Sequence, residues 1–450
     1  LTLGPHSFYW FSLQPETDVA GESGGVVEPQ SLVMLKTHAD WEEIFAGNRT
    51  ALEKQLPTYM LRQRWFGGKG RSVKSTRLQE ITRLQLPEVT AFLTFVRVEY
   101  TDGNGETYIL PISYDEGPEA EALVAEQPLA AIARLRVEAR ESEGYLLDAF
   151  YRTEFHHGLL TMLAKRNSIK GRGGKVTATK TGVFKHLYDR SEPPLETRIL
   201  KAEQSNTSVI YGNRFILKLF RRLQEGVNPD LEIGRFLTRK GFASTPPVAG
   251  ALEYHIGRKE PDTLAILQGF VSNQGDAWDY TLDSLHHYFE RVIEIGRDEA
   301  AVLPRESLVM MSQKALPPDV HRTIGAYLES VRLLARRTAQ MHIVLASETE
   351  DTRFTPEGFS KLYQRSLYQS MRALTLNVLD QVQKQRRKLP EPFQAAAERI
   401  IGRKQDILDS MRALTETKIS GQRLRCHGDF HLGQVLYTGK DFVIIDFEGE

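Results

Sequence analysis

The sequence predicts an α+β protein in which a strand-rich first half is followed by a mainly helical second half. Short apolar or alternating segments bounded by turn residues are concentrated before residue 273 and are typical of strands. After Tyr280 the apolar residues recur at helical spacing over long stretches. A chain of 450 residues, 41% of them hydrophobic, supplies enough material for roughly two to four folded domains.

The first 30 residues divide into two segments. Residues 1–13 mix polar residues with a cluster of aromatic ones and indicate a single strand. Residues 14–30 are rich in Gly, Glu, Pro and Ser, the composition of a flexible linker. We therefore expect a domain boundary here, with the strand belonging to a domain upstream. Because the chain begins within a strand and stops at Glu450 directly after another, we also expect a fragment of a longer protein.

Residues 31–138 are predicted to form an α+β unit. Apolar residues at helical spacing in Ala39–Arg64 predict a helix, which the sequence GGKGR ends. The apolar strands Ala91–Tyr100 and Thr107–Ser113 are joined by TDGNGE, which indicates a hairpin.

The next part of the chain continues with mixed structure. Gly144–Lys165 is helix-like, and Asn167–Lys175 is a basic, glycine-rich loop that we interpret as solvated charge rather than as a phosphate site. Between Arg198 and Phe220, short strands with a turn at Gly212 predict a twisted antiparallel sheet. Four long helices are predicted after it: Leu282–Gly296, Asp319–Ala346, Ser360–Lys388 and Phe393–Thr415.

The last 25 residues, CHGDFHLGQVLYTGKDFVIIDFEGE, carry the most information about chemistry. Two apolar runs are joined at Gly439 and Lys440, which predicts a hairpin that pairs residue 438 with 441 and residue 434 with 445. Gln434 then returns to the same end of the hairpin as Asp446, and Asp429 lies five residues before Gln434. A cluster of oxygen ligands suits Mg²⁺, which usually keeps waters and binds substrate phosphates.

The same spacing occurs in phosphoryl-transfer sites. In the protein-kinase template, a catalytic-loop Asp accepts the hydroxyl proton, a residue five positions later holds a metal, and a second Asp after a short hairpin also binds metal. Here Asp429, Gln434 and Asp446 stand in those places. We interpret His427 as a residue that anchors the loop backbone rather than as a base.

The other half of such a site is expected in the sheet. Lys218 lies in the apolar strand FILKLF, an unusual place for a charge unless it reaches a ligand. Glu232 follows fourteen residues later at the start of a helix, so a Lys218–Glu232 pair would direct the ammonium toward nucleotide phosphates. The loop before this strand offers backbone amides and hydroxyls to phosphates, and its candidate residues are Ser205, Asn206, Thr207 and Ser208.

Three motifs in this order resemble a known family. HGDFHLGQVL with IDFEGE, EQSNTS with ILKLFRRLQEGVNPDLEIGRFL, and QRWFGGKGR near Trp65 together resemble the maltokinases, sugar kinases of the aminoglycoside-phosphotransferase type. Members of this family phosphorylate the anomeric hydroxyl of maltose with ATP and Mg²⁺, which feeds α-glucan (glycogen) synthesis. Residues 3–13 resemble the closing strand of an amylase-type β-domain, as at the junction of trehalose synthase fused to maltokinase.

The resemblance implies a bilobal protein-kinase-like fold with an N-terminal α+β cap, a mixed small lobe and a mainly helical large lobe. By this resemblance Asp429 is the catalytic base, Gln434 and Asp446 bind the metal, and Lys218 with Glu232 positions the phosphates. Fold analogy places adenine at the connector between the lobes, near the backbone of Gln268 to Phe270. The domains expected are a closing strand (1–13), a linker (14–30), a cap (31–138), a small lobe (139–273) and a large lobe (274–450) that lacks its C-terminal helices.

Charge and composition exclude other classes of partner. The 58 basic and 58 acidic residues balance, so nothing draws the whole chain to nucleic acid, and its apolar runs are too short to span a membrane. One cysteine makes no internal disulfide, which favours the cytoplasm. Two alternatives stay open: a kinase of an amino-alcohol or aminoglycoside, whose ammonium needs an anionic pocket, and a non-catalytic kinase-like module that binds glucan or a partner enzyme.

Overall fold

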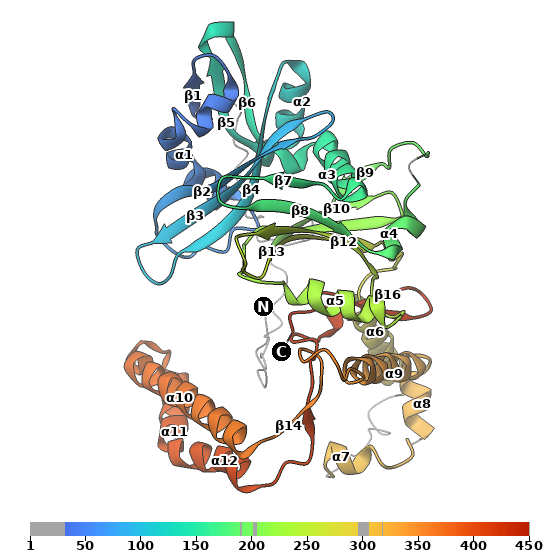
Figure 1. The fold of residues 1–450 in the computed structure, drawn as a ribbon. Coiled ribbons are helices and arrows are strands. Elements are labelled where there is room, and N and C mark those ends of the chain that lie inside the picture. The colour runs from blue at the N-terminus through green and yellow to red at the C-terminus, as the bar shows by residue number, and fades with distance from the viewer. Residues whose placement is uncertain (1–31, 190, 201–204, 296–305, 317, 450) are drawn as a thin grey trace. The chain divides into compact units, whose positions relative to one another are not determined.

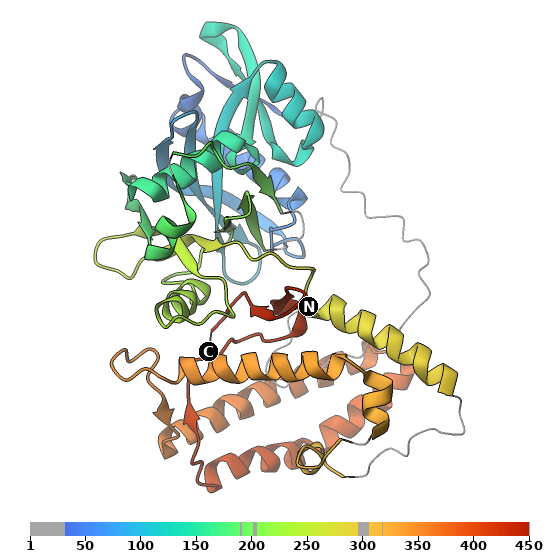
Figure 2. The ribbon, with the colours of Figure 1, turned by 90° about the vertical axis from the view of Figure 1, so that its right-hand side faces the viewer.

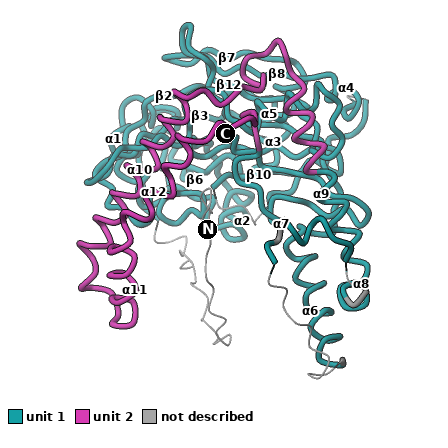
Figure 3. The backbone as a smooth tube through the Cα atoms, turned by 90° about the horizontal axis from the view of Figure 1, so that it is seen from below, with its two compact units in different colours: residues 1–337, 427–449 teal, residues 338–426, 450 magenta. Residues whose placement is uncertain are grey.

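The structure, a computed structural model, describes residues 32–449 except 190, 201–204, 296–305 and 317. The strand and linker predicted for residues 1–30 therefore lie outside the described residues. The chain divides into two compact units: residues 1–337 with 427–449 form unit 1, and residues 338–426 with 450 form unit 2 (Figure 3). In the described part of the chain, no helix combines the length and the apolar character needed to cross a membrane.

The first sheet of unit 1 has six strands in the order β1-β5-β6-β4-β3-β2 (Figure 1). The strands are β1 (Met34–Thr37), β2 (Val73–Gln85), β3 (Thr90–Tyr100), β4 (Glu106–Glu116), β5 (Ala131–Val137) and β6 (Ser142–Asp148). The predicted hairpin is confirmed as the antiparallel pair β3 and β4, and β1 joins β5 in parallel. Buried and exposed residues alternate along β2, which leaves one face of that strand for the core.

Helix α1 (Arg49–Arg62) packs its apolar stripe against this sheet. Leu52, Leu56, Tyr59 and Met60 follow each other at helical spacing and belong to the same buried cluster as strand residues of the sheet. The helix begins later than predicted, because Trp41–Phe45 forms a separate 3₁₀ turn. A second helix, α2 (Pro118–Glu126), lies between β4 and β5 in the sequence.

The first sheet extends beyond the predicted cap boundary at residue 138. Strand β6 pairs with both β4 and β5, so the sheet ends at Asp148, and α3 (Thr153–Lys165) starts only after a 3₁₀ turn. The prediction of one helix over Gly144–Lys165 is wrong in its first part. Helical spacing is a local signal, whereas Leu146 and Leu147 are buried in a strand that pairs with both β4 and β5.

The second sheet of unit 1 has seven strands in the order β7-β8-β12-β13-β11-β10-β9. They are β7 (Ser168–Lys170), β8 (Lys175–Lys180), β9 (Thr197–Ile199), β10 (Asn206–Tyr211), β11 (Phe215–Phe220), β12 (Val248–His255) and β13 (Asp262–Gly269). Neighbouring strands of this sheet pair antiparallel, as the sequence predicts for Arg198 to Phe220. Two further helices of this region are α4 (Gly182–Leu187) and α5 (Pro229–Arg239).

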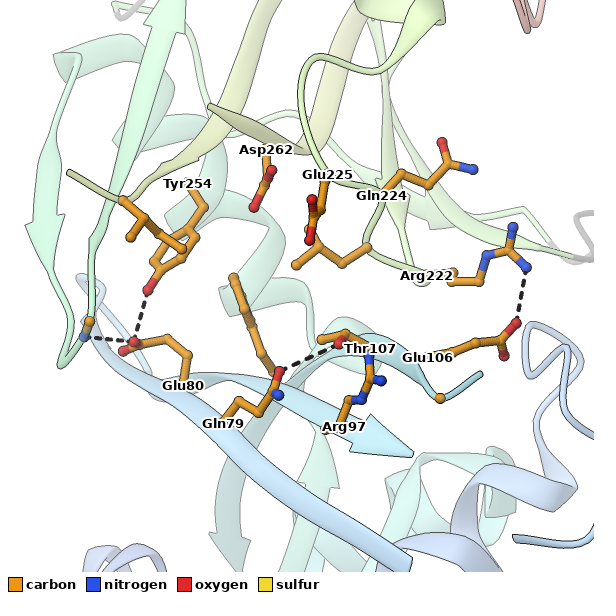
Figure 4. A pocket seen from close by; sticks show the side chains of 15 residues that line it. Gln79, Glu80, Arg97, Glu106, Thr107, Arg222, Gln224, Glu225, Tyr254 and Asp262 are labelled. Carbon is orange, nitrogen blue, oxygen red and sulfur yellow. Dashed lines mark hydrogen bonds and ion pairs between the residues drawn. The ribbon is translucent and has the colours of Figure 1, made fainter. Parts of the chain in front are cut away.

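The glycine-rich loop at 167–175 binds an internal carboxylate. The backbone N–H groups of Arg172 and Gly173 each donate to Glu80 of β2 at 2.7 Å. The hydroxyl of Tyr254 donates to the same carboxylate at 2.8 Å (Figure 4). A Cβ on Gly171 would collide with the Glu80 carboxylate, which explains a glycine there. The loop therefore joins the two sheets, and the amides of Arg172 and Gly173 are bonded to Glu80.

The later chain is helical, with breaks that the periodicity missed. The helices are α6 (Ala277–Ile295), α7 (Leu308–Met311), α8 (Pro318–Ile324), α9 (Tyr327–Leu345), α10 (Lys361–Gln385), α11 (Glu391–Gly402) and α12 (Lys404–Glu416). The helix predicted over Asp319–Ala346 is interrupted at Gly325, whose φ of 66° is left-handed. Two short strands, β14 (Glu357–Gly358) and β15 (Gln422–Arg423), pair within unit 2.

Candidate active site

The C-terminal hairpin of unit 1 has the predicted register. Strands β16 (Val435–Tyr437) and β17 (Phe442–Ile444) pair Val435 with Ile444, and the N–H of Ile445 donates to the carbonyl of Gln434 at 3.0 Å. At the other end, the N–H of Thr438 donates to the carbonyl of Asp441 at 2.9 Å. Gln434 and Ile445 therefore lie side by side at the open end of the hairpin, directly before Asp446.

Two other segments hold this hairpin in place. Its β17 strand is bonded to the segment before β12, because the N–H of Ile444 donates to the carbonyl of Ser244 at 2.9 Å. On the other side, the N–H of Tyr437 donates to the carbonyl of Gly275, and the Tyr437 ring stacks on Tyr280 of α6 at 4.1 Å between centroids. The hairpin thus lies next to α5 and α6 (Figures 1 and 2).

His427 anchors the loop that carries Asp429, as the sequence predicts. Its Nε2 lies 2.7 Å from the carbonyl oxygen of Ile445, which only accepts, so this nitrogen donates. Its Nδ1 accepts from the N–H of Asp429 at 3.4 Å, and its own carbonyl accepts from Glu448 and Gly449. Burial lowers the pKa of His427, which favours the neutral ring. The histidine therefore fixes the Asp429 loop to the end of β17.

Lys218 joins the sheet to the hairpin. Its Nζ lies 2.6 Å from Oδ1 of Asp446 and 3.5 Å from Oδ2 of Asp230 on α5. Asp446 has a φ of 59°, a left-handed conformation that costs energy for a residue with a Cβ and is often kept at functional sites. The structure thus brings together two of the predicted site residues, which are 228 positions apart in the sequence.

Asp230 is the residue of this cluster that sequence reasoning missed. Its side chain is 4% exposed, and its Oδ1 accepts from the N–H of Phe447 at 3.3 Å. Burial raises the pKa of Asp230, while the charge of Lys218 partly opposes this shift. A signal was available, because Asp230 directly follows Pro229 in the first turn of α5, where acids favour the helix N-terminus.

Glu232, the predicted partner of Lys218, lies on the same helix at a half-buried position. Residues two apart on a helix do not face each other. The structure places Asp230 of α5 at the lysine, a contact that the sequence did not predict. The pairing of Glu232 with Lys218 stays a prediction that a mutant cycle can test.

The donor set fits a magnesium ion of low protein coordination. Asp446 and Gln434 offer a carboxylate and a carboxamide at one end of the hairpin, and Asp429, with an 11% exposed side chain, lies in the preceding loop. In the described part of the chain, no group of three or more His, Cys, Asp or Glu side chains is arranged to hold a metal. Two protein ligands completed by water and nucleotide phosphates are what Mg²⁺ commonly accepts. The metal roles of Gln434 and Asp446 stay predictions.

The predicted phosphate loop differs from the structure. Asn206, Thr207 and Ser208 lie within β10, opposite Phe220, Leu219 and Lys218 of β11, and only Ser205 precedes the strand. Ser208 is fully buried, and Thr207 accepts from Arg221 Nε at 2.8 Å. Pairing with β11 lengthens the strand past the point where local sequence predicts a loop. Nucleotide contact by these four residues stays a prediction.

The segment predicted to contact adenine, Gln268 to Phe270, begins within strand β13 rather than after it. The N–H of Gly269 donates to the carbonyl of Pro247, and the N–H of Phe270 donates to the carbonyl of Arg214, both at 2.9 Å. Gln268 lies in β13, paired with Ile216 on one side and with Val248 on the other. These two N–H groups are thus bonded to other backbone carbonyls, and contact of the Gln268 to Phe270 backbone with a base edge stays a prediction. Carbonyl and side-chain contacts from Gln268 and Phe270 stay predictions.

A two-sheet unit with a strand lysine, a hairpin aspartate and an anchored aspartate loop defines a kinase-like phosphotransferase fold of mixed α+β class. Comparison with protein families agrees. The chain belongs to the phosphotransferase enzyme family (APH), whose model matches residues 196–449, and the maltokinase N-terminal cap domain matches residues 59–151. Together the two matches form a maltokinase-like architecture. The cap match includes β6, which in the structure belongs to the first sheet.

The individual relatives are more distant. The chain is 23% identical over 274 residues to a glucosamine kinase of Mycolicibacterium smegmatis, covering 60% of this chain and 56% of that protein. It is 25% identical over 269 residues to a glucosamine kinase of Streptacidiphilus jiangxiensis, covering 58% and 50%. The chain thus spans about half the length of the curated relatives it matches.

Solved structures of glucosamine kinase are also similar. One crystal form has a TM-score of 0.49 at 20% identity and covers 91% of this chain and 72% of that one. The complex with glucosamine, ADP and inorganic phosphate has a TM-score of 0.47, also at 20% identity, with 83% and 67% covered.

Proposed function

We propose that this protein is an ATP-dependent sugar kinase that phosphorylates the anomeric hydroxyl of maltose to give maltose 1-phosphate. The observation that carries the proposal is the 2.6 Å contact of Lys218 with Asp446, next to a loop in which His427 anchors Asp429. Phosphoryl transfer needs mainly positioned charge and an oriented hydroxyl, and in the proposal Lys218 and Asp446 provide the first and Asp429 the second.

Each side chain has a role in the proposal. Lys218 neutralises phosphate oxygens, and Asp230 with Asp446 holds its ammonium in place. Asp446 and Gln434 would hold the Mg²⁺ ion, which when bound adds positive charge at the phosphates. Asp429 accepts a hydrogen bond from the acceptor hydroxyl, which orients the oxygen for in-line attack on the γ-phosphorus of ATP. It takes the hydroxyl proton as the new O–P bond forms and the bond between the γ-phosphorus and the leaving ADP breaks.

Maltose is favoured over other acceptors by the cap. The maltokinase cap model matches residues 59–151, which form most of the first sheet with the end of α1. The proposed reaction belongs to the trehalose and α-glucan pathway. The protein would act in the cytoplasm, where ATP is available. A trehalose synthase domain would be fused upstream of it. Each of these points rests on the family resemblance rather than on a contact with sugar.

The curated relatives favour an aminosugar as the second candidate acceptor. Both are glucosamine kinases, and an ammonium on the acceptor would require acidic groups near Asp429. The third reading, a non-catalytic glucan or partner module, is opposed by the joint presence of Lys218, Asp429 and Asp446, since each has a distinct task only in catalysis.

A panel of acceptors tests the proposal. ATP consumption should be measured with maltose, glucose, glucosamine and an aminoglycoside, with Asp429→Asn as the inactive reference. We expect maltose to give the highest kcat/KM and a phosphorus NMR signal coupled to the anomeric proton. Preference for glucosamine would replace the acceptor while keeping the kinase. If nucleotide is neither bound nor consumed with any acceptor, the kinase proposal is wrong.

A further inference from the structure

The segment that follows the lysine strand leaves the second sheet and joins the first. The N–H of Ile109 donates to the carbonyl of Arg221 at 2.7 Å, and the N–H of Leu223 donates to the carbonyl of Thr107 at 2.9 Å. Between these bonds, Arg222 pairs with Tyr108 of β4 as an isolated bridge. Figure 4 shows the neighbouring ion pair of Arg222 with Glu106, 3.3 Å apart. The chain around Lys218 is therefore continuous with the cap sheet.

The guanidinium of Arg221 is sealed at this junction. Arg221 and Asp148, the last residue of β6, both have fully buried side chains, and Nη2 lies 2.8 Å from Oδ2 of Asp148. The two groups carry opposite charges, so the contact is an ion pair. Among the described residues, neither terminal nitrogen of Arg221 has a partner that meets the geometry of a hydrogen bond. The ring of Trp65, from the QRWFGGKGR motif, lies 5.0 Å from the guanidinium carbon.

Asp148 is itself held from the cap side. Its Oδ2 accepts from the hydroxyl of Tyr59 on α1 at 3.1 Å, and its Oδ1 accepts from the N–H of Phe150 at 3.0 Å. On the other side of Arg221, Nε donates to the hydroxyl of Thr207 at 2.8 Å. One buried cation thus joins three elements: the cap sheet, β10 and the end of β11.

Stability alone explains such a pair poorly. Moving two charges out of water is costly, and a buried ion pair can often be replaced by apolar residues without loss of stability. The position of the pair is more informative. Along an extended segment, residues three apart point to opposite faces, so Arg221 faces the cap while Lys218 faces Asp446 and Asp230. Thr207 likewise adjoins Ser208, the register partner of Lys218.

We propose that Asp148 acts through Arg221 as a positioning residue for Lys218 and for the start of β10, so that nucleotide binding depends on a cap ion pair that nucleotide does not touch. The inference rests on the proposed function, because it requires Lys218 to contact phosphates. It assigns the cap a task in catalysis: its aspartate holds the register and angle of the β10–β11 hairpin from behind.

The test replaces the pair by apolar residues in the full-length protein. The double variant Asp148→Leu/Arg221→Met replaces both charged side chains by apolar ones. Binding of Mg·ADP is measured by calorimetry, melting by circular dichroism, and KM and kcat with the best acceptor. We expect a fold that melts cooperatively, an affinity for Mg·ADP and a KM for ATP about tenfold worse, and kcat at saturating ATP within about threefold.

Glu253→Gln is the matched control. Glu253 of β12 is a buried carboxylate paired with Arg235 of α5 at 2.9 Å, outside the β10–β11 hairpin, and its variant should bind Mg·ADP like the wild type. A cooperatively folded double variant with wild-type affinity and KM would overturn the inference, as would an equal loss in the control.

A milder variant covers the case in which the double variant does not fold. Tyr59→Phe removes one hydrogen bond to Asp148 and should raise the KM for ATP about two- to threefold. Its circular dichroism spectrum should match that of the wild type. An unchanged KM contradicts the inference. Failure of the proposed function looks different, because then the wild type does not bind Mg·ADP or Lys218→Met binds it equally well.

Discussion

Lys218 and Arg221 lie three residues apart, and each is paired with an aspartate from a distant part of the chain. The lysine pair is open: the side chain of Asp446 is 39% exposed. The arginine pair is closed, because the side chains of Arg221 and Asp148 are both 0% exposed. The same type of charge pair therefore occurs twice. One pair is accessible to a ligand, and the other is buried and contacts only protein atoms. Exposure, rather than residue type, separates a binding role from a positioning role.

The largest effect is expected on the open side, at Asp429. Asp429→Asn should lower kcat about 10²- to 10⁴-fold and leave nucleotide affinity within about tenfold, because its carboxylate acts on the acceptor and not on ATP. Steady-state kinetics and nucleotide titration measure both. Asp441→Asn, which loses the contact with Arg337 at the hairpin turn, is the control and should retain most activity. A variant at Asp429 that keeps more than about a tenth of the wild-type kcat contradicts the role.

Asp446 should show its role through the metal. Asp446→Ala is expected to weaken Mg·ATP binding more than ATP binding without metal, because the variant loses a carboxylate ligand as well as the contact with Lys218. Gln434→Ala should have the same effect at smaller size. Nucleotide titrations with and without Mg²⁺ decide the matter: an undiminished gain from the metal in the variants would mean that other residues hold it.

Variants of Asp230 and Glu232, the two acids in the first turn of α5, test which of them acts together with Lys218. Asp230→Asn and Lys218→Met should each raise the KM for ATP or lower kcat, and their double variant should be little worse than the worse single one, because they act as a unit. If Glu232 only complements the helix N-terminus, Glu232→Gln should cost at most about 1 kcal/mol of stability and leave ATP kinetics unchanged. If Glu232 also aims Lys218 at the phosphates, the variant should raise the KM for ATP or lower kcat, and its effect should not add to that of Lys218→Met.

Near the buried Arg221–Asp148 pair, pH should change the free energy of unfolding rather than kcat, because of the buried His156. His156 is buried beside Phe150, its Nε2 is 2.8 Å from the Phe150 carbonyl, and burial lowers its pKa to about 4. Between pH 6.5 and 4 His156 is protonated in the unfolded chain but stays neutral in the folded protein. The free energy of unfolding therefore falls as the pH falls through this window. From pH 6.5 to 5 the loss is at most about 2 kcal/mol. Denaturant melts of wild type and His156→Gln check it, and an equal pH dependence of both would contradict it.

Local signals account for the features that the sequence predicted well. The register of the C-terminal hairpin follows from a turn at Gly439 and two short apolar runs, all within about ten residues, and the structure reproduces the pairing of residue 434 with 445. The anchoring role of His427 depends on the same short segment. The helix breaks at Gly325 and Arg403 were missed because periodicity averages over a window longer than the break.

The amino-acid sequence by itself determined the α+β class, the β3–β4 hairpin, the hairpin of the candidate site and the residue types gathered there, since each depends on neighbours along the chain. Only the tertiary structure decided that β6 belongs to the cap sheet, that Asp230 faces Lys218, and that residues 206–208 form a strand. It alone revealed the buried pair of Arg221 with Asp148, 73 residues apart in the numbering of the chain. Such contacts depend on how two sheets and a helix meet, and no local propensity encodes which carboxylate a buried cation will find.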